Sequence, residues 1–143
     1  MPNANVLLVD DEVPFVEAMT KRLAKRELNI ISAVSAEEAL NRLEEDRSIE
    51  VVILDVKMPV MDGIEALRLI KARYPLVEVI MLTGHGSVES AIEGMKLGAF
   101  DYLMKPCDID ELVSKVEEAA IKKRQHENKI IEARMKEITG RRT

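Results

Sequence analysis

Short apolar runs recur along the chain and are separated by longer segments with helical periodicity. Three runs are continuous and bounded by polar or turn residues: Val6–Val9, Val51–Leu54 and Val79–Leu82. Two weaker runs occupy Ile30–Val34 and Phe100–Met104. Continuous runs of this length, rather than alternating ones, are typical of strands that are buried on both faces. The pattern therefore predicts five strands of a parallel sheet.

The segments between the apolar runs carry signals for helix starts and ends. Pro14 suits the first turn of a helix, and Gly98 suits a helix end before the last strand. Three pairs have the spacing of a capping box: Ser35 with Glu38, Asp62 with Glu65, and Asp108 with Glu111. Strands that alternate with helices on short connections predict five βα units. The expected fold class is α/β, a doubly wound parallel five-stranded sheet with helices on both faces and right-handed crossovers.

The last helix is expected to be much longer than the others. It should run from about Asp108 to about Ile138, with Gly140 as its stop, which exceeds what one small sheet can cover. Its second half has a heptad-like seam with spacings of three and four: Ile121, Arg124, Asn128, Ile131, Met135 and Ile138. The seam covers roughly two heptads, fewer than the ~3–4 that establish a coiled coil, so a dimer contact and a solvated helix both fit. We expect one domain over residues 1–121 and a helical extension or linker over residues 122–143.

Composition narrows the classes of protein to which the chain can belong. Its 143 residues are 47% hydrophobic and 33% charged, which suits one domain with a real core and excludes a disordered chain. No apolar run approaches the ~20 residues of a membrane helix, and no basic segment precedes the first run. The single cysteine, Cys107, cannot form an internal disulfide. We therefore expect a cytoplasmic location and no membrane partner.

Charge is distributed unevenly between the expected domain and its extension. Residues 1–121 carry a net charge of −10, and residues 122–143 carry +5. Nucleic-acid binding relies on Lys and Arg at phosphates and on aromatic stacking platforms. The acidic body and the four aromatic residues of the whole chain argue against direct contact with nucleic acid.

Polar side chains directly follow four of the predicted strands: Asp10, Asp11 and Glu12 after the first, Asp55 after the third, Thr83 after the fourth and Lys105 after the fifth. In an open parallel sheet the carboxyl ends of the strands meet at one edge, where ligands bind. The joint placement of these residues, one set at each strand end, indicates a functional site.

Three clustered carboxylates repel one another unless a cation lies between them. Carboxylate ligands without Cys or His favour Mg²⁺, or alternatively Mn²⁺, over zinc. A carboxylate beside such an ion can attack phosphorus and form an aspartyl phosphate. Lys105 and Thr83 would then supply an ammonium and a hydroxyl to the phosphoryl oxygens. The alternative, in which Lys105 is a salt-bridge partner and Thr83 a loop residue, leaves the carboxylate cluster unexplained.

These residues lie within longer motifs that together are highly specific: Val9-Asp10-Asp11; Leu54-Asp55-Val56-Lys57-Met58-Pro59 with Met61-Asp62-Gly63; Leu82-Thr83-Gly84; and Gly98-Ala99-Phe100-Asp101-Tyr102-Leu103-Met104-Lys105-Pro106. Over about residues 4–121 the sequence resembles a receiver domain of the two-component response-regulator family. Residues 81–106 most resemble receivers of enhancer-dependent transcriptional activators.

The resemblance implies a flavodoxin-like fold with strand order 2-1-3-4-5. It implies that Asp55 accepts a phosphoryl group from a sensor histidine kinase or a phosphotransfer protein. Asp10, Asp11 and Asp55 would hold Mg²⁺ together with the backbone carbonyl of Lys57. The domain would catalyse its own phosphorylation and dephosphorylation, with no turnover of an external substrate.

The resemblance also implies a switch. Lys105 would contact the phosphoryl group and precede Pro106 through a cis peptide bond. Thr83 would move toward the phosphoryl group, and Tyr102 would swing inward behind it. The face that changes would comprise the fourth helix, the fifth strand and the fifth helix, over about residues 87–102 and from Asp108 onward. A homodimer could form through this face and the C-terminal helix.

The residues argue against three other functions. A haloacid-dehalogenase-type phosphatase places its nucleophile in a D-x-D after the first strand, whereas Asp55 is followed by Val56-Lys57 and no cap domain is visible. A flavodoxin-like electron carrier needs a hydroxyl-rich phosphate loop after the first strand, where Asp10 and Asp11 would repel the FMN phosphate. A degenerate receiver that serves only as an interaction module is disfavoured because all five site residues are present. The kinase partner and the output stay open.

Overall fold

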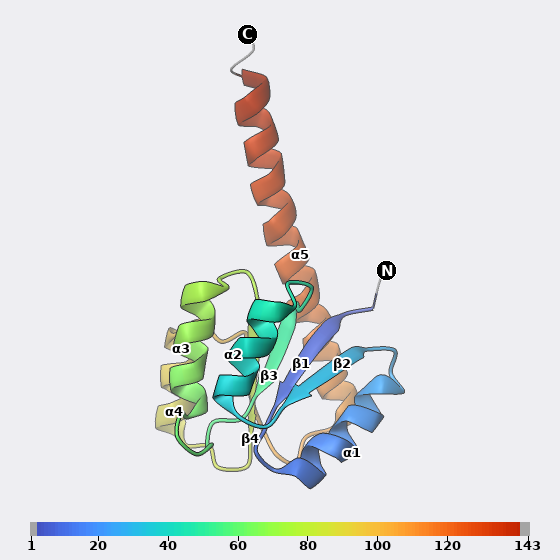
Figure 1. Ribbon diagram of the computed structural model, residues 1–143, viewed down its shortest axis with the longest axis vertical. Coiled ribbons are helices and arrows are strands. Elements are labelled where there is room, and N and C mark those ends of the chain that lie inside the picture. The colour runs from blue at the N-terminus through green and yellow to red at the C-terminus, as the bar shows by residue number, and fades with distance from the viewer. Residues whose placement is uncertain (1–2, 141–143) are drawn as a thin grey trace.

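A five-stranded parallel sheet forms the centre of the fold in a computed structural model, which describes residues 3–140 (Figure 1). Its strands are β1 (Asn5–Val9), β2 (Asn29–Ala33), β3 (Val51–Leu54), β4 (Glu78–Thr83) and β5 (Asp101–Met104). They lie in the order β2-β1-β3-β4-β5, and all neighbouring pairs are parallel. This order is the predicted one, and it confirms the doubly wound fold class.

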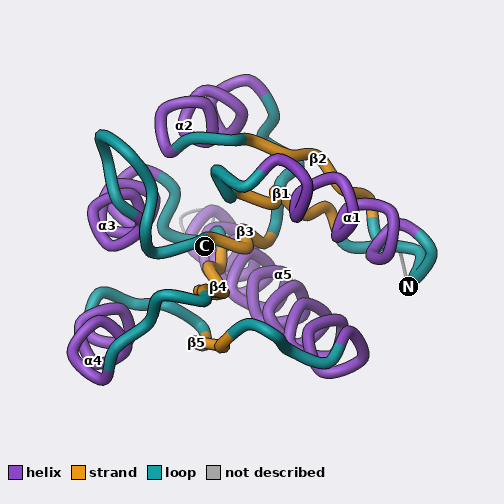
Figure 2. The backbone as a smooth tube through the Cα atoms, turned by 90° about the horizontal axis from the view of Figure 1, so that it is seen from below, coloured by secondary structure: helices purple, strands orange, loops and turns teal. Residues whose placement is uncertain are grey.

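Helices cover both faces of the sheet (Figure 2). They are α1 (Val13–Ala24), α2 (Ala36–Glu45), α3 (Gly63–Arg73), α4 (Val88–Lys96) and α5 (Ile109–Gly140). Two hydrophobic clusters fill the two spaces between helices and sheet. One lies beneath α2 and α3 and includes Leu7 and Leu54, and the other lies beneath α1 and α5 and includes Leu8 and Ile53.

The burial of both sheet faces explains why the central strands read as unbroken apolar runs. Successive side chains of a strand point to opposite faces, and here each face meets a helix layer. All side chains of β3 and β4 are buried, whereas the edge strands β2 and β5 are mostly half-buried. Apart from β3, whose bounds are the predicted ones, each strand differs from its predicted run by one residue at one end or both. β2 begins at Asn29 and ends before the exposed Val34, and β5 begins at Asp101.

Side-chain caps begin several of the helices. The Ser35 hydroxyl accepts from the Glu38 N–H (3.1 Å), and the Asp62 carboxylate accepts from the Glu65 N–H (2.9 Å), as predicted. The predicted pairing of Asp108 with Glu111 is not seen, because the Asp108 carboxylate accepts from Asp110 instead (3.4 Å). A reciprocal capping box between Ser87 and Ser90 begins α4 and was not predicted from the sequence.

The last helix extends well beyond the sheet as a single projecting rod (Figure 1). We call its part from residue 122 onward the α5 arm. The helix reaches Gly140, which is the last described residue, and the expected stop there stays a prediction. The predicted seam is wrong at Arg124, whose guanidinium turns back onto the domain and pairs with Glu50. Among the described residues, no helix combines the length and apolar character that crossing a membrane requires.

Candidate functional site

The carboxyl ends of the strands bring the predicted polar residues together. Asp10 follows β1, Asp55 follows β3, Thr83 ends β4 and Lys105 follows β5. Asp10 and Asp55 are each 1% exposed, and Thr83 is fully buried. Asp11 is exposed beside them. Parallel topology thus converts four positions far apart in sequence into one cluster.

Three carboxylates form the centre of this cluster. One oxygen from each of Asp10, Asp11 and Asp55 lies within 4.8 Å of the other two. The second carboxylate oxygen of Asp55, Oδ2, is buried and receives no hydrogen bond from any residue in the described range. An unsatisfied buried carboxylate oxygen facing two further carboxylates suits a hard cation, which prefers oxygen ligands.

A cleft of about 450 Å³ opens beside the carboxylates. It is lined by Asp11, Glu12, Lys57, Met58, Pro59 and His85. The lining includes Lys57, whose backbone carbonyl the resemblance names as a ligand. The cleft therefore reaches the carboxylate cluster at Asp11, whereas the buried Asp55 is not part of its lining.

The local backbone fixes the Asp55 carboxylate. Its Oδ1 accepts from the Val56 N–H (2.9 Å), and its own N–H donates to the Val9 carbonyl of β1 (3.0 Å). Burial raises the pKa of the Asp55 carboxyl, and the Asp10 carboxylate adds to the rise. The Thr83 hydroxyl and the Lys105 ammonium lower the pKa of Asp55, but by less than burial and Asp10 raise it. The ionised form of Asp55 therefore lacks the positive charge that would stabilise it fully.

Lys105 is engaged with Asp10 rather than with Asp55. Its ammonium lies 2.6 Å from Asp10 Oδ2, 3.5 Å from Glu12 Oε1 and 3.9 Å from the centre of the Phe15 ring. Burial by itself would lower the pKa of Lys105, but the adjoining carboxylates, Asp10 above all, outweigh it and raise that pKa. Lys105 is thus a charged salt-bridge partner here, at a position from which its long side chain reaches the cluster. The Lys105–Pro106 peptide bond is cis, as the resemblance implied.

Thr83 and Tyr102 occupy neighbouring strands behind the cluster. The Thr83 hydroxyl accepts from the His85 N–H (3.0 Å). The Tyr102 hydroxyl is hydrogen-bonded to that of Ser90 in the first turn of α4 (2.7 Å). A side chain at Gly86 would collide with the Tyr102 hydroxyl, so the small residue leaves room for the ring in this position.

The connection from Asp55 to α3 is tightly constrained. The Gly63 N–H donates to the Val56 carbonyl (2.6 Å), and a Cβ at Gly63 would overlap the backbone carbonyl of Asp55. Val60 adopts a left-handed conformation with φ of 70°, which is unfavourable for a β-branched residue. Backbone strain of this kind clusters at functional sites, where surrounding structure holds it in place.

Two contacts at the site could not be predicted from the sequence. The Phe15 ring over Lys105 depends on how α1 is rotated, and the bond from Ser90 to Tyr102 depends on where α4 begins. The Ser87-to-Ser90 spacing was the only available signal for the second contact, because it marks a helix start.

Comparison with known proteins adds an independent line of evidence. A family model described as "Response regulator receiver domain" matches residues 6–117. The "Transcriptional regulatory protein ZraR" of Escherichia coli O157:H7 is 39% identical over 117 residues, which are 82% of this chain and 26% of ZraR. The chain thus spans about a quarter of the length of the curated relatives that it matches.

Solved structures that resemble this chain are receiver domains as well. A response regulator receiver domain protein from Clostridium thermocellum superposes with a TM-score of 0.82 at 38% identity, covering 85% of this chain and 98% of that one. The receiver domain of NtrX from Brucella abortus superposes with a TM-score of 0.75 at 32% identity, covering 80% and 97% of the two chains.

Proposed function

Because this chain belongs to the response regulator receiver domain family of two-component systems, we propose that Asp55 accepts a phosphoryl group from a histidine kinase or a phosphotransfer protein. One observation carries the proposal. A buried carboxylate oxygen of Asp55 has no donor within residues 3–140 and lies in a cluster with two further carboxylates. We propose residues 1–121 as the phosphoacceptor domain and residues 122–143 as its extension, of which residues 141–143 lie outside the described range.

The donor set fits Mg²⁺, with Mn²⁺ as an alternative. Asp10, Asp11 and Asp55 would hold the ion, and the Lys57 carbonyl would be a further ligand. When bound, the ion supplies positive charge that favours ionised Asp55 and neutralises phosphoryl oxygens.

The chemistry of transfer is then a displacement at phosphorus. A carboxylate oxygen of Asp55 attacks, the P–N bond of the phosphohistidine breaks, and the electron pair leaves with the imidazole. The Lys105 ammonium moves from Asp10 to a phosphoryl oxygen, and the Thr83 hydroxyl donates to another. The same residues support later hydrolysis of the acyl phosphate, so the domain acts catalytically only on itself.

The response to phosphorylation is carried by Thr83 and Tyr102. Movement of Thr83 toward the phosphoryl group opens space behind it, into which Tyr102 swings after breaking its bond to Ser90. The face next to Tyr102, formed by α4, β5 and α5, exposes several large apolar side chains: Val88, Ile92, Met95 and Met104. We propose this face, together with the α5 arm, as the surface for a second copy of the chain or an output partner.

The relatives suggest what the output controls. ZraR is named a transcriptional regulatory protein, and NtrC of Proteus hauseri a DNA-binding transcriptional regulator. We propose that phosphorylation of this receiver likewise regulates transcription. Its acidic body argues that any contact with DNA is made by other parts of the assembly.

A phosphotransfer experiment tests the proposal. The chain is mixed with a histidine kinase phosphorylated with radiolabelled ATP, with Mg²⁺ or with EDTA, and the label is followed on gels. We expect label on the parent chain in Mg²⁺ only, and none on Asp55→Asn, which preserves shape but removes the nucleophile. Labelling of the Asp55→Asn variant at the parent level would refute Asp55 as acceptor.

A further inference from the structure

The amino edge of the sheet, opposite the proposed phosphorylation site, holds two buried carboxylates that the proposed function does not use. Glu50 directly precedes β3, and Glu78 begins β4. They are 6% and 3% exposed, and they are neighbours, since the Glu78 N–H donates to the Glu50 carbonyl (3.1 Å). The same two strands lead at their other ends to Asp55 and Thr83.

Two adjacent buried carboxylates are costly unless cations or donors meet them, because they lose hydration and repel each other. The domain itself supplies part of what they need. The Asn5 N–H donates to Glu50 Oε1 (3.1 Å), and the Lys71 ammonium lies 3.2 Å from Glu78 Oε1. The remaining oxygens, Glu50 Oε2 and Glu78 Oε2, face α5.

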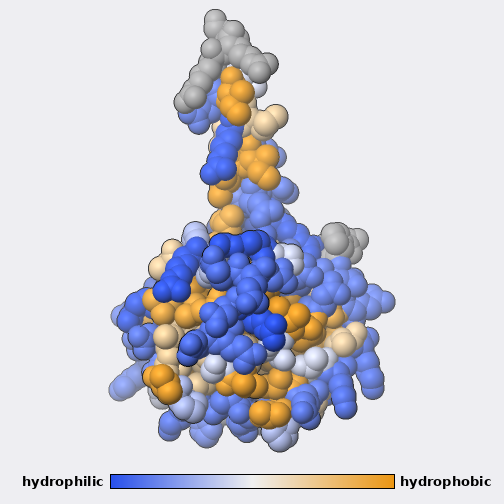
Figure 3. Space-filling model, in the orientation of Figure 1, coloured by the Kyte–Doolittle hydropathy of each residue, from blue (hydrophilic) through white to orange (hydrophobic). Residues whose placement is uncertain are grey.

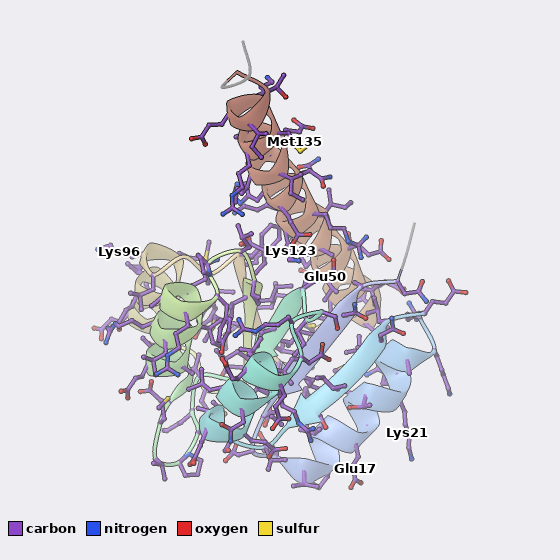
Figure 4. All side chains as sticks on the ribbon, turned by 45° about the horizontal axis from the view of Figure 1, so that its top comes forward. Glu17, Lys21, Glu50, Lys96, Lys123 and Met135 are labelled. Carbon is purple, nitrogen blue, oxygen red and sulfur yellow. The ribbon has the colours of Figure 1, made fainter. Side chains whose placement is uncertain are left out.

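The first turn of the α5 arm supplies the remaining charge. Arg124 binds Glu50 in a bidentate arrangement, with Nε 2.6 Å from Oε2 and a terminal nitrogen 2.8 Å from Oε1. The Lys122 ammonium lies 3.2 Å from Glu78 Oε2 and offsets its charge, although this oxygen accepts no hydrogen bond within the described residues. Burial alone would raise the pKa of Glu50, but Arg124 and the Asn5 N–H lower it. Figure 4 shows Glu50 beside the stretch of α5 labelled at Lys123.

Helix geometry explains how both carboxylates are reached from one turn. Successive residues are about 100° apart around a helix, so residues 122 and 124 flank the face that carries residue 123. That face is turned toward the domain, because Ala119 and Ala120 are buried just before it and Lys123 is only 12% exposed. The Lys123 ammonium instead bonds Glu127 in the next turn (2.6 Å).

The two ion pairs lie in the last part of the helix that packs against the domain, which ends at residue 127. From residue 128 to residue 140 every residue is exposed, along the part of the helix that projects in Figure 3. An isolated helix of this length is marginal in water, so contacts at the base of the arm decide how well it is ordered and where it points.

We propose that Glu50 and Glu78 form a latch for the α5 arm, in which Arg124 and Lys122 fix the direction of the arm relative to the sheet. The latch holds the exposed apolar residues farther along the arm, Ile131, Met135 and Ile138, at a set orientation relative to the sheet. The inference rests on these pairs alone and does not depend on phosphorylation of Asp55.

Distance measurement between spin labels tests the latch in the full chain. Labels are attached to cysteines at exposed positions of α2 and of the arm, Glu45→Cys and Lys136→Cys, in a Cys107→Ser background. A small amount of labelled chain diluted into unlabelled chain removes distances between copies. We expect one narrow distance distribution, which Arg124→Gln broadens at least about twofold because the base of the arm is freed.

Lys129→Gln is the matched control. It removes the same charge from the arm, at an exposed residue with no ion pair among those that the structure describes, and it should leave the distribution narrow. Arg124→Lys should give an intermediate width, because it keeps the charge but loses the bidentate bond. Hydrogen exchange of amides 122–130 should rise about tenfold in Arg124→Gln and stay unchanged in Lys129→Gln.

Glu50→Gln tests the same ion pair from the side of the domain. It should broaden the distribution as Arg124→Gln does, and the double variant should be no broader than either single one. Equal widths for the parent and Arg124→Gln, or equal broadening by Arg124→Gln and Lys129→Gln, would overturn the proposal.

Discussion

At the scale of single residues, the site is dominated by the burial of negative charge. Asp10 and Asp55 are almost completely removed from solvent, yet among residues 3–140 only Asp10 has a cation in direct contact, Lys105 at 2.6 Å. The raised pKa of Asp55 reflects this asymmetry. The site is therefore electrostatically incomplete by itself, and its residues stabilise a positive ion or an added phosphoryl group bearing its own cation.

Removal of the Asp55 charge should stabilise the metal-free protein. A folded-state pKa above the unfolded value means that the parent loses stability as pH rises through that pKa, whereas asparagine does not ionise. The advantage of Asp55→Asn should therefore be smallest at acidic pH, below the ordinary carboxyl pKa of about 4, and should grow as the pH rises to neutrality. Urea unfolding in EDTA measures it, with the exposed Glu45→Gln as control. An advantage that does not grow with pH would contradict this electrostatic account.

Gly63 should be intolerant of any side chain. Its Cβ would overlap the Asp55 backbone carbonyl, and backbone cannot move aside as a flexible side chain can. We expect Gly63→Ala to destabilise the fold by about 2 kcal/mol or more and to weaken Mg²⁺ binding, because Asp55 is displaced. Thermal unfolding and metal titration measure the two effects. Gly140→Ala is the control, since a Cβ added there meets no heavy atom within 4 Å outside the adjoining backbone of its own helix, and equal effects at both glycines would refute the claim.

The residues of the site were predictable to the extent that topology alone places them. Asp10, Asp55, Thr83 and Lys105 follow strands, and parallel strands must end at a common edge, so their meeting required only the strand pattern. Contacts that depend on helix rotation or rotamer, such as Phe15 with Lys105, required the structure. The role of Tyr102 rests on family resemblance, since in the sequence it is simply a strand residue.

At the scale of elements, α5 is the feature that sets this chain apart from a minimal receiver. Its first half packs on the sheet through Leu112, Val116 and Ala119, and its second half is exposed. The sequence pattern predicted the length of the helix but not its pairing with the domain. Glu50 and Glu78 stand at the starts of apolar runs, where a charged residue is typical of a strand boundary, and Arg124 fitted a heptad spacing equally well.

The exposed apolar residues of the arm should support self-association. Ile131, Met135 and Ile138 lie on one side of the arm at heptad-like spacing and are 52%, 61% and 53% exposed. Replacing all three with serine keeps the latch at the base intact. We expect sedimentation equilibrium to show a dimer of the parent and a monomer of the triple variant, with at least a tenfold weaker association constant. Identical mass distributions would show that the arm does not pair in this way.

The fold as a whole was predictable because its central strands are buried on both faces and read as unbroken apolar runs. The edge strands β2 and β5 are less buried, which weakened their patterns. One-residue shifts of the strand bounds occur in the buried β4 as well as at the edges, so they do not follow from burial. Buried carboxylates lie at both edges of the same sheet. Those at the carboxyl edge form the proposed metal site, and those at the amino edge form ion pairs with Lys71, Lys122 and Arg124.

Intact mass spectrometry after incubation with acetyl phosphate tests the central claim most directly. The parent chain is incubated with Mg²⁺, beside a sample in EDTA and the Asp55→Asn variant in Mg²⁺. The account predicts a gain of one phosphoryl group in the parent with Mg²⁺ and none in either control. An equal gain in the Asp55→Asn variant, or no gain in a folded parent chain with Mg²⁺ bound even when a phosphorylated histidine kinase is supplied, would contradict Asp55 as the phosphoacceptor.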